Sequence, residues 1–289
     1  MDLNKDAQID TGQIEDRRGA GGGGLSGMPI PMPSGRGGWI MTIIFLIVAL
    51  AGGGVLGGNM LSDDGGSGDL AEKCAASNPN RLDEPDCRSA LFITSIQDYW
   101  QDALPATLGK PYQTAKTVFF SQAVSTGCGQ ADSSVGPFYC PPDGKVYIDL
   151  SFYDELESRF GAKGVFAQAY VLAHEYGHHV QNLLGVGVGG QGDSVPVELQ
   201  ADCYSGVWAK HATQTTDASG RPLIKSLSQA DIQSALDAAA AVGDDTIQKK
   251  TTGHVDESKF THGSAAQRQH WFSTGYESGD PKSCDTFSA

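Results

Sequence analysis

Near the middle of the chain, two histidines and a glutamate occur at the spacing H-E-x-x-H. Residues four apart on a helix lie on the same face, so His174 and His178 can present two ring nitrogens to one cation. Glu175 lies beside them, where its carboxylate can reach a metal-bound water, as zinc-dependent hydrolysis requires. Apolar neighbours predict a buried, rigid helix: Val171, Leu172, Val180, Leu183 and Leu184. The alternative is an ordinary buried helix whose histidines bond to neighbouring carbonyl groups.

A third ligand distinguishes these readings, because catalytic zinc needs three protein ligands and one open position. One subclass of the motif continues with a histidine at position 184, but this residue is Leu184. Glu198, twenty residues after His178, is the other candidate, and Asp202 follows it on the same helix face. Asp202 could accept the free ring N–H of a ligating histidine. A solvated helix face is the alternative, and it is weakened by apolar neighbours: Val197, Leu199, Val207 and Trp208.

The combination of these two motifs resembles the zincins with a glutamate ligand, the group to which thermolysin belongs. The more specific resemblance is to the bacterial neutral zinc metallopeptidase family of membrane-anchored proteins. It is carried by TGCG (126–129), GPFYCP (136–141), VYIDL (146–150), HEYGHHVQ (174–181), ELQADC (198–203), FTHG (260–263) and Arg268. Together these motifs extend from about Lys110 to Phe287.

The resemblance implies a zincin-like α+β domain that binds one Zn²⁺ per chain and hydrolyses peptide bonds, as an endopeptidase rather than an exopeptidase. The implied zinc ligands are His174, His178 and Glu198, with Glu175 as general base. His262 or Arg268 would stabilise the oxyanion, a role that a histidine fills opposite the base in the resembled families. Without the zinc motif, His262 and Arg268 would be interpreted as capping or surface residues.

Patterns on either side predict the elements that surround the site. Residues 117–124 and 145–150 are rich in β-branched and aromatic residues and predict strands. Apolar residues at helical spacing predict helices over 91–104 and 232–242. In the resembled zincins an edge strand lines the cleft and pairs with the extended substrate. The glycine-rich residues 185–192 predict either a mobile loop at the cleft or a plain linker.

The beginning of the chain has a different composition. Residues 1–38 are polar and Gly-rich and predict a flexible cytoplasmic tail. Residues 39–61 are almost uncharged and predict one transmembrane helix, with a buried core helix or a cleaved signal peptide as alternatives. Basic residues precede this segment, so we expect the N-terminus in the cytoplasm and the catalytic domain outside it, in the periplasm or extracellular space. A linker (62–87) and one metallopeptidase domain (88–289) complete the expected organisation.

All six cysteines follow the apolar segment, as expected for an exported domain whose disulfides persist. Six cysteines allow 15 pairings. Local spacing favours Cys74 with Cys87 and Cys128 with Cys140, which leaves Cys203 with Cys284. A zinc–cysteine cluster is the weaker alternative, because the chain contains no C-x-x-C pair.

The net charge of −14, with no basic patch in the expected domain, makes nucleic acid an improbable partner. We therefore expect a membrane-anchored zinc peptidase that acts on a peptide or protein substrate in the cell envelope. Two rivals stay open: a non-catalytic scaffold in which the metal joins two helices, and a zinc hydrolase of another bond. An intact Glu175 argues against the scaffold, since a structural zinc site has no need of a base.

Overall fold

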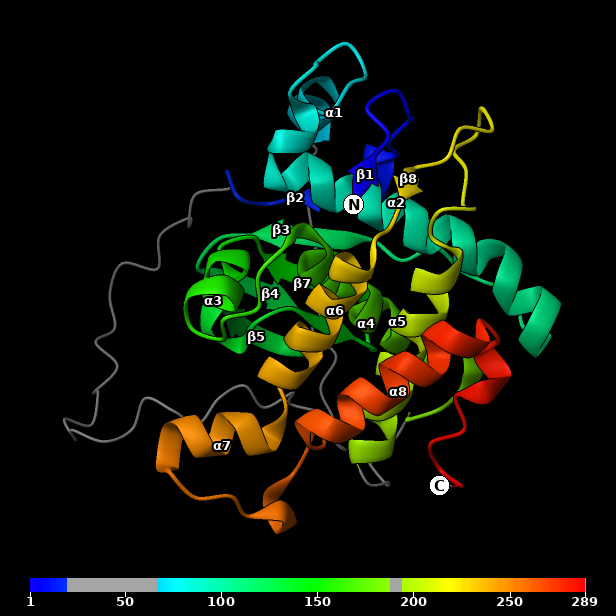
Figure 1. The fold of residues 1–289 in the computed structure, drawn as a ribbon. Coiled ribbons are helices and arrows are strands. Elements are labelled where there is room, and N and C mark those ends of the chain that lie inside the picture. The colour runs from blue at the N-terminus through cyan, green and yellow to red at the C-terminus, as the bar shows by residue number, and fades with distance from the viewer. Residues whose placement is uncertain (20–66, 188–193, 289) are drawn as a thin grey trace, which may run out of the picture.

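The structure is a computed structural model that describes residues 1–19, 67–187 and 194–288. These residues form an α+β fold with small sheets, as expected (Figure 1). The strands are β1 (Asp2–Leu3), β2 (Ile14–Asp16), β3 (Thr117–Phe120), β4 (Ala123–Thr126), β5 (Gly129–Asp132), β6 (Phe138–Cys140), β7 (Lys145–Asp149) and β8 (Ile224–Ser226). The α-helices are α1 (Ser67–Lys73), α2 (Pro85–Ala103), α3 (Phe152–Ser158), α4 (Val165–Leu184), α5 (Ser194–His211), α6 (Gln229–Ala241), α7 (Asp244–Thr252) and α8 (Ala265–Ser278).

The largest described sheet has the strand order β2-β3-β7-β6. β2 and β7 run parallel to β3, whereas β6 is antiparallel to β7 and forms one edge. All four residues of β3 are buried, as expected for an apolar strand with neighbours on both sides. The strand predicted over 117–124 is two strands, because Gln122 adopts φ 68° and turns the chain between β3 and β4.

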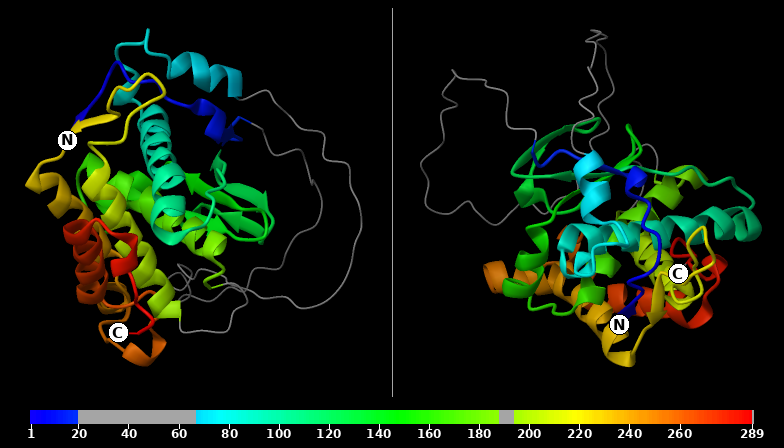
Figure 2. Two further views of the ribbon diagram at one scale, coloured as in Figure 1. Left: turned by 90° about the vertical axis from the view of Figure 1, so that its right-hand side faces the viewer. Right: turned by 90° about the horizontal axis from the view of Figure 1, so that it is seen from above.

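Three helices pack closely around the predicted site. α4 contacts α5, and α5 contacts α8 along its length (Figure 2). Glycines permit this approach: a Cβ on Gly275 of α8 would lie 2.0 Å from the carbonyl oxygen of Cys203, and one on Gly206 would lie 2.1 Å from that of Phe272. On the other face of α5, a Cβ on Gly177 would lie 2.9 Å from the Cα of Ala201. Glycine thus allows backbones to touch on both sides of α5. The expected helices over 91–104 and 232–242 are present as parts of α2 and α6.

The first 19 residues are part of the fold, which corrects the expectation of a flexible tail for this part of residues 1–38, whereas residues 20–38 lie outside the described residues. β1 pairs with β8, and β2 pairs with β3. Arg81, in the segment expected to be a linker, donates to the carbonyls of Lys5 and Ala7 at 3.0 and 2.5 Å. Composition missed this because short strands are stabilised by distant partners and not by their own sequence.

The predicted fold class also included a transmembrane helix, and this part is corrected. The segment, residues 39–61, lies outside the described residues, and no helix within the described ranges is long and apolar enough to cross a membrane. In addition, β2 precedes the segment and β3 follows it, yet the two strands pair. A chain that crossed a bilayer once between them would place the strands in different compartments. The expected single-pass topology therefore does not fit this sheet.

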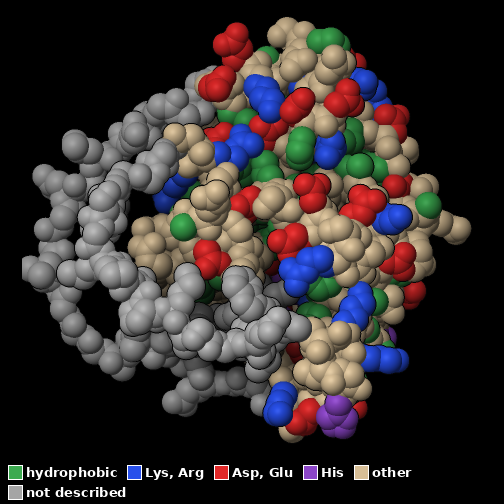
Figure 3. Space-filling view, turned by 90° about the vertical axis from the view of Figure 1, so that its left-hand side faces the viewer, with side chains coloured by type: hydrophobic (Ala, Val, Ile, Leu, Met, Phe, Trp, Pro, Cys, Tyr) green, Lys and Arg blue, Asp and Glu red, His purple; other side chains and the backbone are tan. Residues whose placement is uncertain are grey.

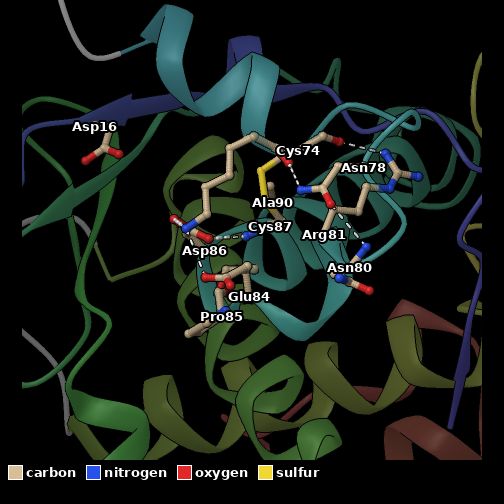
Figure 4. The surroundings of a disulfide bond; sticks show 12 residues. Asp16, Cys74, Asn78, Asn80, Arg81, Glu84, Pro85, Asp86, Cys87 and Ala90 are labelled. Atoms are coloured by element: carbon tan, nitrogen blue, oxygen red, sulfur yellow. Dashed lines mark hydrogen bonds and ion pairs between the residues drawn. A yellow bond between two sulfur atoms is a disulfide. The ribbon is translucent and has the colours of Figure 1, made fainter.

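The three expected disulfides are present: Cys74–Cys87, Cys128–Cys140 and Cys203–Cys284. The first joins Cys74, the residue after α1, to the start of α2, next to Asp86 and Arg81 (Figure 4). Asp86 accepts from Lys73 at 2.9 Å and from Arg18 at 2.9 Å, which ties the N-terminal segment to this junction. Acidic and basic side chains are interspersed over the molecular face drawn in Figure 3.

Candidate active site

The H-E-x-x-H residues lie in the middle of α4, on the part of the helix that faces α5. His174 and Glu175 are buried, and the helix ends at Gly185 in the left-handed region, with φ 77°. Because α4 is buried along most of its length, its side chains are held in fixed positions by neighbours on several elements. The pattern thus predicted both the helix and its burial.

Glu198 on α5 faces both histidines. Its Oε2 lies 3.1 Å from Nε2 of His174, and its Oε1 lies 3.5 Å from Nε2 of His178. One ligand atom from each residue lies within 4.8 Å of the other two, so the set could hold a single metal ion. Burial alone would raise the pKa of Glu198, but the facing histidines hold it well below its ordinary value. An ionised carboxylate and two imidazoles form the donor set that Zn²⁺ prefers at catalytic sites.

Asp202 orients the first of these histidines. Its Oδ1 lies 2.8 Å from Nδ1 of His174 and accepts from the hydroxyl of Tyr170 at 2.5 Å. Arg268 donates to the same carboxylate from Nε at 2.8 Å and from Nη2 at 3.0 Å. Burial would raise the pKa of Asp202, but Arg268 and His174 lower it to about 2. The carboxylate therefore stays charged and holds the proton of His174 on Nδ1, which leaves Nε2 to face Glu198.

Glu175 is not one of the ligand set. It is 3 % exposed, and its Oε2 has no hydrogen-bond partner among the described residues. Burial, with a contribution from the nearby charge of Glu198, raises the pKa of Glu175 to about 8. A carboxyl group whose pKa lies near neutrality in a cleft is typical of a general acid or base.

Glu175 opens into a cavity with mostly apolar walls. His174, Glu175, His262 and Arg268 form its polar side. The remaining lining residues come from the loop before β6, from α3, from α4 and from the end of α6: Val135, Gly136, Pro137, Phe152, Tyr170, Val171 and Val242. The cavity is therefore a place where an apolar group can lie beside the candidate base.

His262 reaches the cavity from the loop before α8. Asp244, the first residue of α7, accepts from the backbone N–H groups of Thr261, His262 and Gly263 at 2.7, 2.7 and 3.0 Å. The other oxygen of Asp244 lies 3.3 Å from Nδ1 of His262. One carboxylate thus fixes both the loop backbone and the ring of the histidine.

The structure brings all seven predicted site residues to one region: His174, Glu175, His178, Glu198, Asp202, His262 and Arg268. Arg268, however, contacts Asp202 and not only the cavity. Arg268 uses Nε and Nη2 on Asp202, and its Nη1 donates to the carbonyl of Val242 at 3.3 Å. Tyr170 and Asp244 were not predicted. Tyr170 lies four residues before His174, so helical spacing alone could have identified it, whereas the role of Asp244 depends on a contact between distant loops.

His179, which the sequence gives no role, lies in a separate buried network. Its Nε2 faces the carbonyl oxygen of Gln113, and its Nδ1 lies 3.0 Å from the hydroxyl of Tyr139 on β6. Asn182 donates to the same hydroxyl at 2.8 Å. These bonds attach the edge strand β6 to α4, beside the candidate ligands.

The chain matches a protein-family model described as "Putative neutral zinc metallopeptidase" over residues 3–287. It is 49% identical over 230 residues to the uncharacterized protein Rv2575 of Mycobacterium tuberculosis, and this alignment covers 76% of each chain. It is 40% identical over 290 residues to the uncharacterized protein YpfJ of Escherichia coli (strain K12), and this alignment covers 95% of each chain. No solved structure matches the chain. The family match includes the N-terminal strands as well as the candidate site.

Proposed function

The chain belongs to the family of neutral zinc metallopeptidases, and we propose that it hydrolyses peptide bonds with Glu175 as the general base. The observation that carries the proposal is the buried Glu175 carboxyl, which borders the ligand set and opens into a cavity. A site that only joined two helices would need no such group. The resemblance that predicted an endopeptidase makes an internal peptide bond the preferred target.

The side chains of His174, His178 and Glu198 suit Zn²⁺, because all three donors converge and the first histidine is oriented by Asp202. When bound, zinc supplies a Lewis acid that polarises a carbonyl group and lowers the pKa of a water molecule. A nearby cation also lowers the pKa of Glu175, which favours its ionised form at neutral pH.

The other residues of the site then have separate tasks. Glu175 takes a proton from the attacking water and later delivers it to the leaving nitrogen. His262, whose Nδ1 faces Asp244, donates from Nε2 to the developing oxyanion in the form that carries a proton on both ring nitrogens. Arg268 keeps Asp202 charged and in place, so we assign the oxyanion role to His262 and not to Arg268. The apolar walls of the cavity favour a substrate with an apolar side chain next to the cleaved bond.

Glu175→Gln tests the proposal. We expect hydrolysis of a complex peptide library to fall by roughly 10²–10⁴-fold, because the base is lost, while zinc content stays at one ion per chain. Glu198→Ala is the matched control that removes a ligand, and it should lose the metal. A Glu175→Gln protein that cleaves peptides like the wild type would refute the role of Glu175. A wild type that binds zinc but cleaves no peptide would favour another bond or a scaffold.

We also propose that the domain, including residues 1–19, acts outside the cytoplasm on a peptide or protein substrate of the cell envelope. Three disulfides support this, because such bonds persist in oxidising compartments. Thiol alkylation in intact cells, followed by peptide mapping, measures the state of the six cysteines. Recovery of all six as free thiols would contradict the location.

A further inference from the structure

The second histidine ligand, His178, contacts a side-chain amide. Its Nδ1 lies 2.8 Å from Oε1 of Gln181, one turn later on α4. Gln181 in turn donates from Nε2 to the carbonyl of Val197 at 2.7 Å and to Oε1 of Gln200 at 3.1 Å. Gln200 donates from its own Nε2 to the carbonyl of Cys284 at 2.9 Å. Two buried amides therefore connect His178 to the C-terminal segment.

The direction of every bond in this series is fixed by the carbonyl groups at its ends. A carbonyl can only accept, so Gln200 must turn its amide nitrogen toward Cys284 and its oxygen toward Gln181. Gln181 must then turn its nitrogen toward Gln200 and Val197, and its oxygen toward His178. An amide oxygen also only accepts, so the ring proton of His178 must lie on Nδ1. Nε2, the nitrogen nearest Glu198, keeps the lone pair that metal binding requires.

The C-terminal segment that ends the series is itself fixed to the first half of α5. Cys284 is bonded to Cys203, the residue after Asp202. Thr286 donates from Oγ1 to the carbonyl of Pro196 at 2.6 Å, two residues before Glu198. The carbonyl of Cys284 therefore has a fixed position relative to the third ligand.

We propose that Gln181 and Gln200 are positioning residues: an amide relay that starts at the Cys284 carbonyl sets the tautomer and ring plane of His178 for metal binding. The proposal rests on the proposed function only in that the ligand set binds zinc. Asp202 contacts Nδ1 of the first histidine ligand, and the amide of Gln181 contacts Nδ1 of the second.

Zinc affinity of the full chain, measured by competition with a chromophoric chelator, tests the relay independently of hydrolysis. Loss of a direct partner of a ligating histidine typically weakens metal binding about 10–100-fold, and we expect this for Gln181→Met. Gln200→Met touches no ligand, and we expect a smaller loss, on the order of 3–10-fold, because Gln181 then keeps only the Val197 carbonyl of the two acceptors that orient its amide. The double variant should bind zinc no more weakly than Gln181→Met alone, since Gln200 acts only through Gln181.

Gln200→Glu separates the relay from simple packing. A carboxylate still accepts from Gln181 and keeps its orientation, although it loses the bond to Cys284. We therefore expect zinc affinity near that of the wild type, together with lower thermal stability than Gln200→Met, because a charge is buried. The absorption spectrum of the Co²⁺-loaded protein should likewise be changed by Gln200→Met and restored by Gln200→Glu.

Gln97→Met is the matched control, because Gln97 is a buried glutamine that bonds to Gln13 and Ala115 and to no ligand. It should lower the melting temperature and leave zinc affinity unchanged. The relay is refuted if Gln200→Met binds zinc as tightly as the wild type, if the two Met variants multiply in effect, or if Gln200→Glu is no better than Gln200→Met. A wild type that binds zinc without cleaving peptides would refute only the proposed activity.

Discussion

Gly177 lies between the two histidine ligands and contacts the helix that carries the third. A Cβ added to Gly177 would lie 2.9 Å from the Cα, 3.0 Å from the carbonyl oxygen and 3.1 Å from the Cβ of Ala201. Ordinary contacts between such atoms begin near 3.4 Å, so Gly177→Ala forces α4 and α5 apart by several tenths of an ångström. Zinc–ligand distances tolerate about 0.2 Å. The substitution should therefore disturb metal binding more than folding.

The two effects on folding partly cancel. Alanine in a helix interior is favoured over glycine by roughly 1 kcal/mol, whereas an overpacked contact typically costs about 1–3 kcal/mol. We expect a net loss of about 1 kcal/mol in the free energy of unfolding of the metal-free protein. Chelator competition should show at least a roughly tenfold weaker affinity for zinc. If Gly177→Ala folds and binds zinc within twofold of the wild type, the close approach of the helices does not set the ligand geometry.

Two further predictions concern stability. Burial, and then the charges of Asp10, Asp102 and Asp217, raise the pKa of Asp98 from 3.8 to about 6. This shift corresponds to roughly 3 kcal/mol of folding free energy, which solvent screening at a partly exposed site reduces to about 1–2 kcal/mol. Because burial disfavours the ionised form of Asp98, its contribution to stability is fully present below the unfolded pKa of 3.8 and is lost as the pH rises through the folded pKa of about 6. Asp98→Asn should therefore unfold at a higher urea concentration than the wild type at pH 7, but not at pH 3.5. Equal urea midpoints of the two proteins at pH 7 would contradict this prediction. Replacing Cys203 and Cys284 by alanine removes a disulfide that joins residues 81 positions apart. The free energy of unfolding, measured by heat or urea, should fall by roughly 4–5 kcal/mol. An unchanged unfolding midpoint would show that packing alone holds the C-terminus.

The sequence predicted those parts of the site that depend on spacing within one element. His174, Glu175 and His178 lie on one helix, and Glu198 and Asp202 lie on another, so their relative positions follow from helical geometry. The disulfide pairs followed from local spacing and from the even number of cysteines. The partners of these residues could not be predicted in the same way. Gln200 and Cys284 are 84 positions apart, and only the packing of the C-terminal segment on α5 brings them together.

The N-terminal segment shows the opposite case, in which composition gave a wrong expectation. Its polar, Gly-rich residues predict disorder when considered alone. Arg18 nevertheless lies over the ring of Phe119, with 5.4 Å between the guanidinium carbon and the ring centroid, and pairs with Asp86 at 2.9 Å. Neither contact has a local sequence signal, because each joins residues about 70 or 100 positions apart. Long-range pairing of this kind is where sequence patterns carry the least information.

The pairing of β2 with β3 has a consequence for synthesis of the chain. Ile14 pairs with Thr117, so β2 leaves the ribosome long before its neighbour exists. At about 5–20 residues per second, this strand waits roughly 5–20 s for its partner. Until β2 is added, the fully buried strand β3 keeps one row of backbone donors and acceptors open to other chains. Once β2 pairs with β3, it covers this row of backbone groups and protects the apolar strand from pairing with other chains.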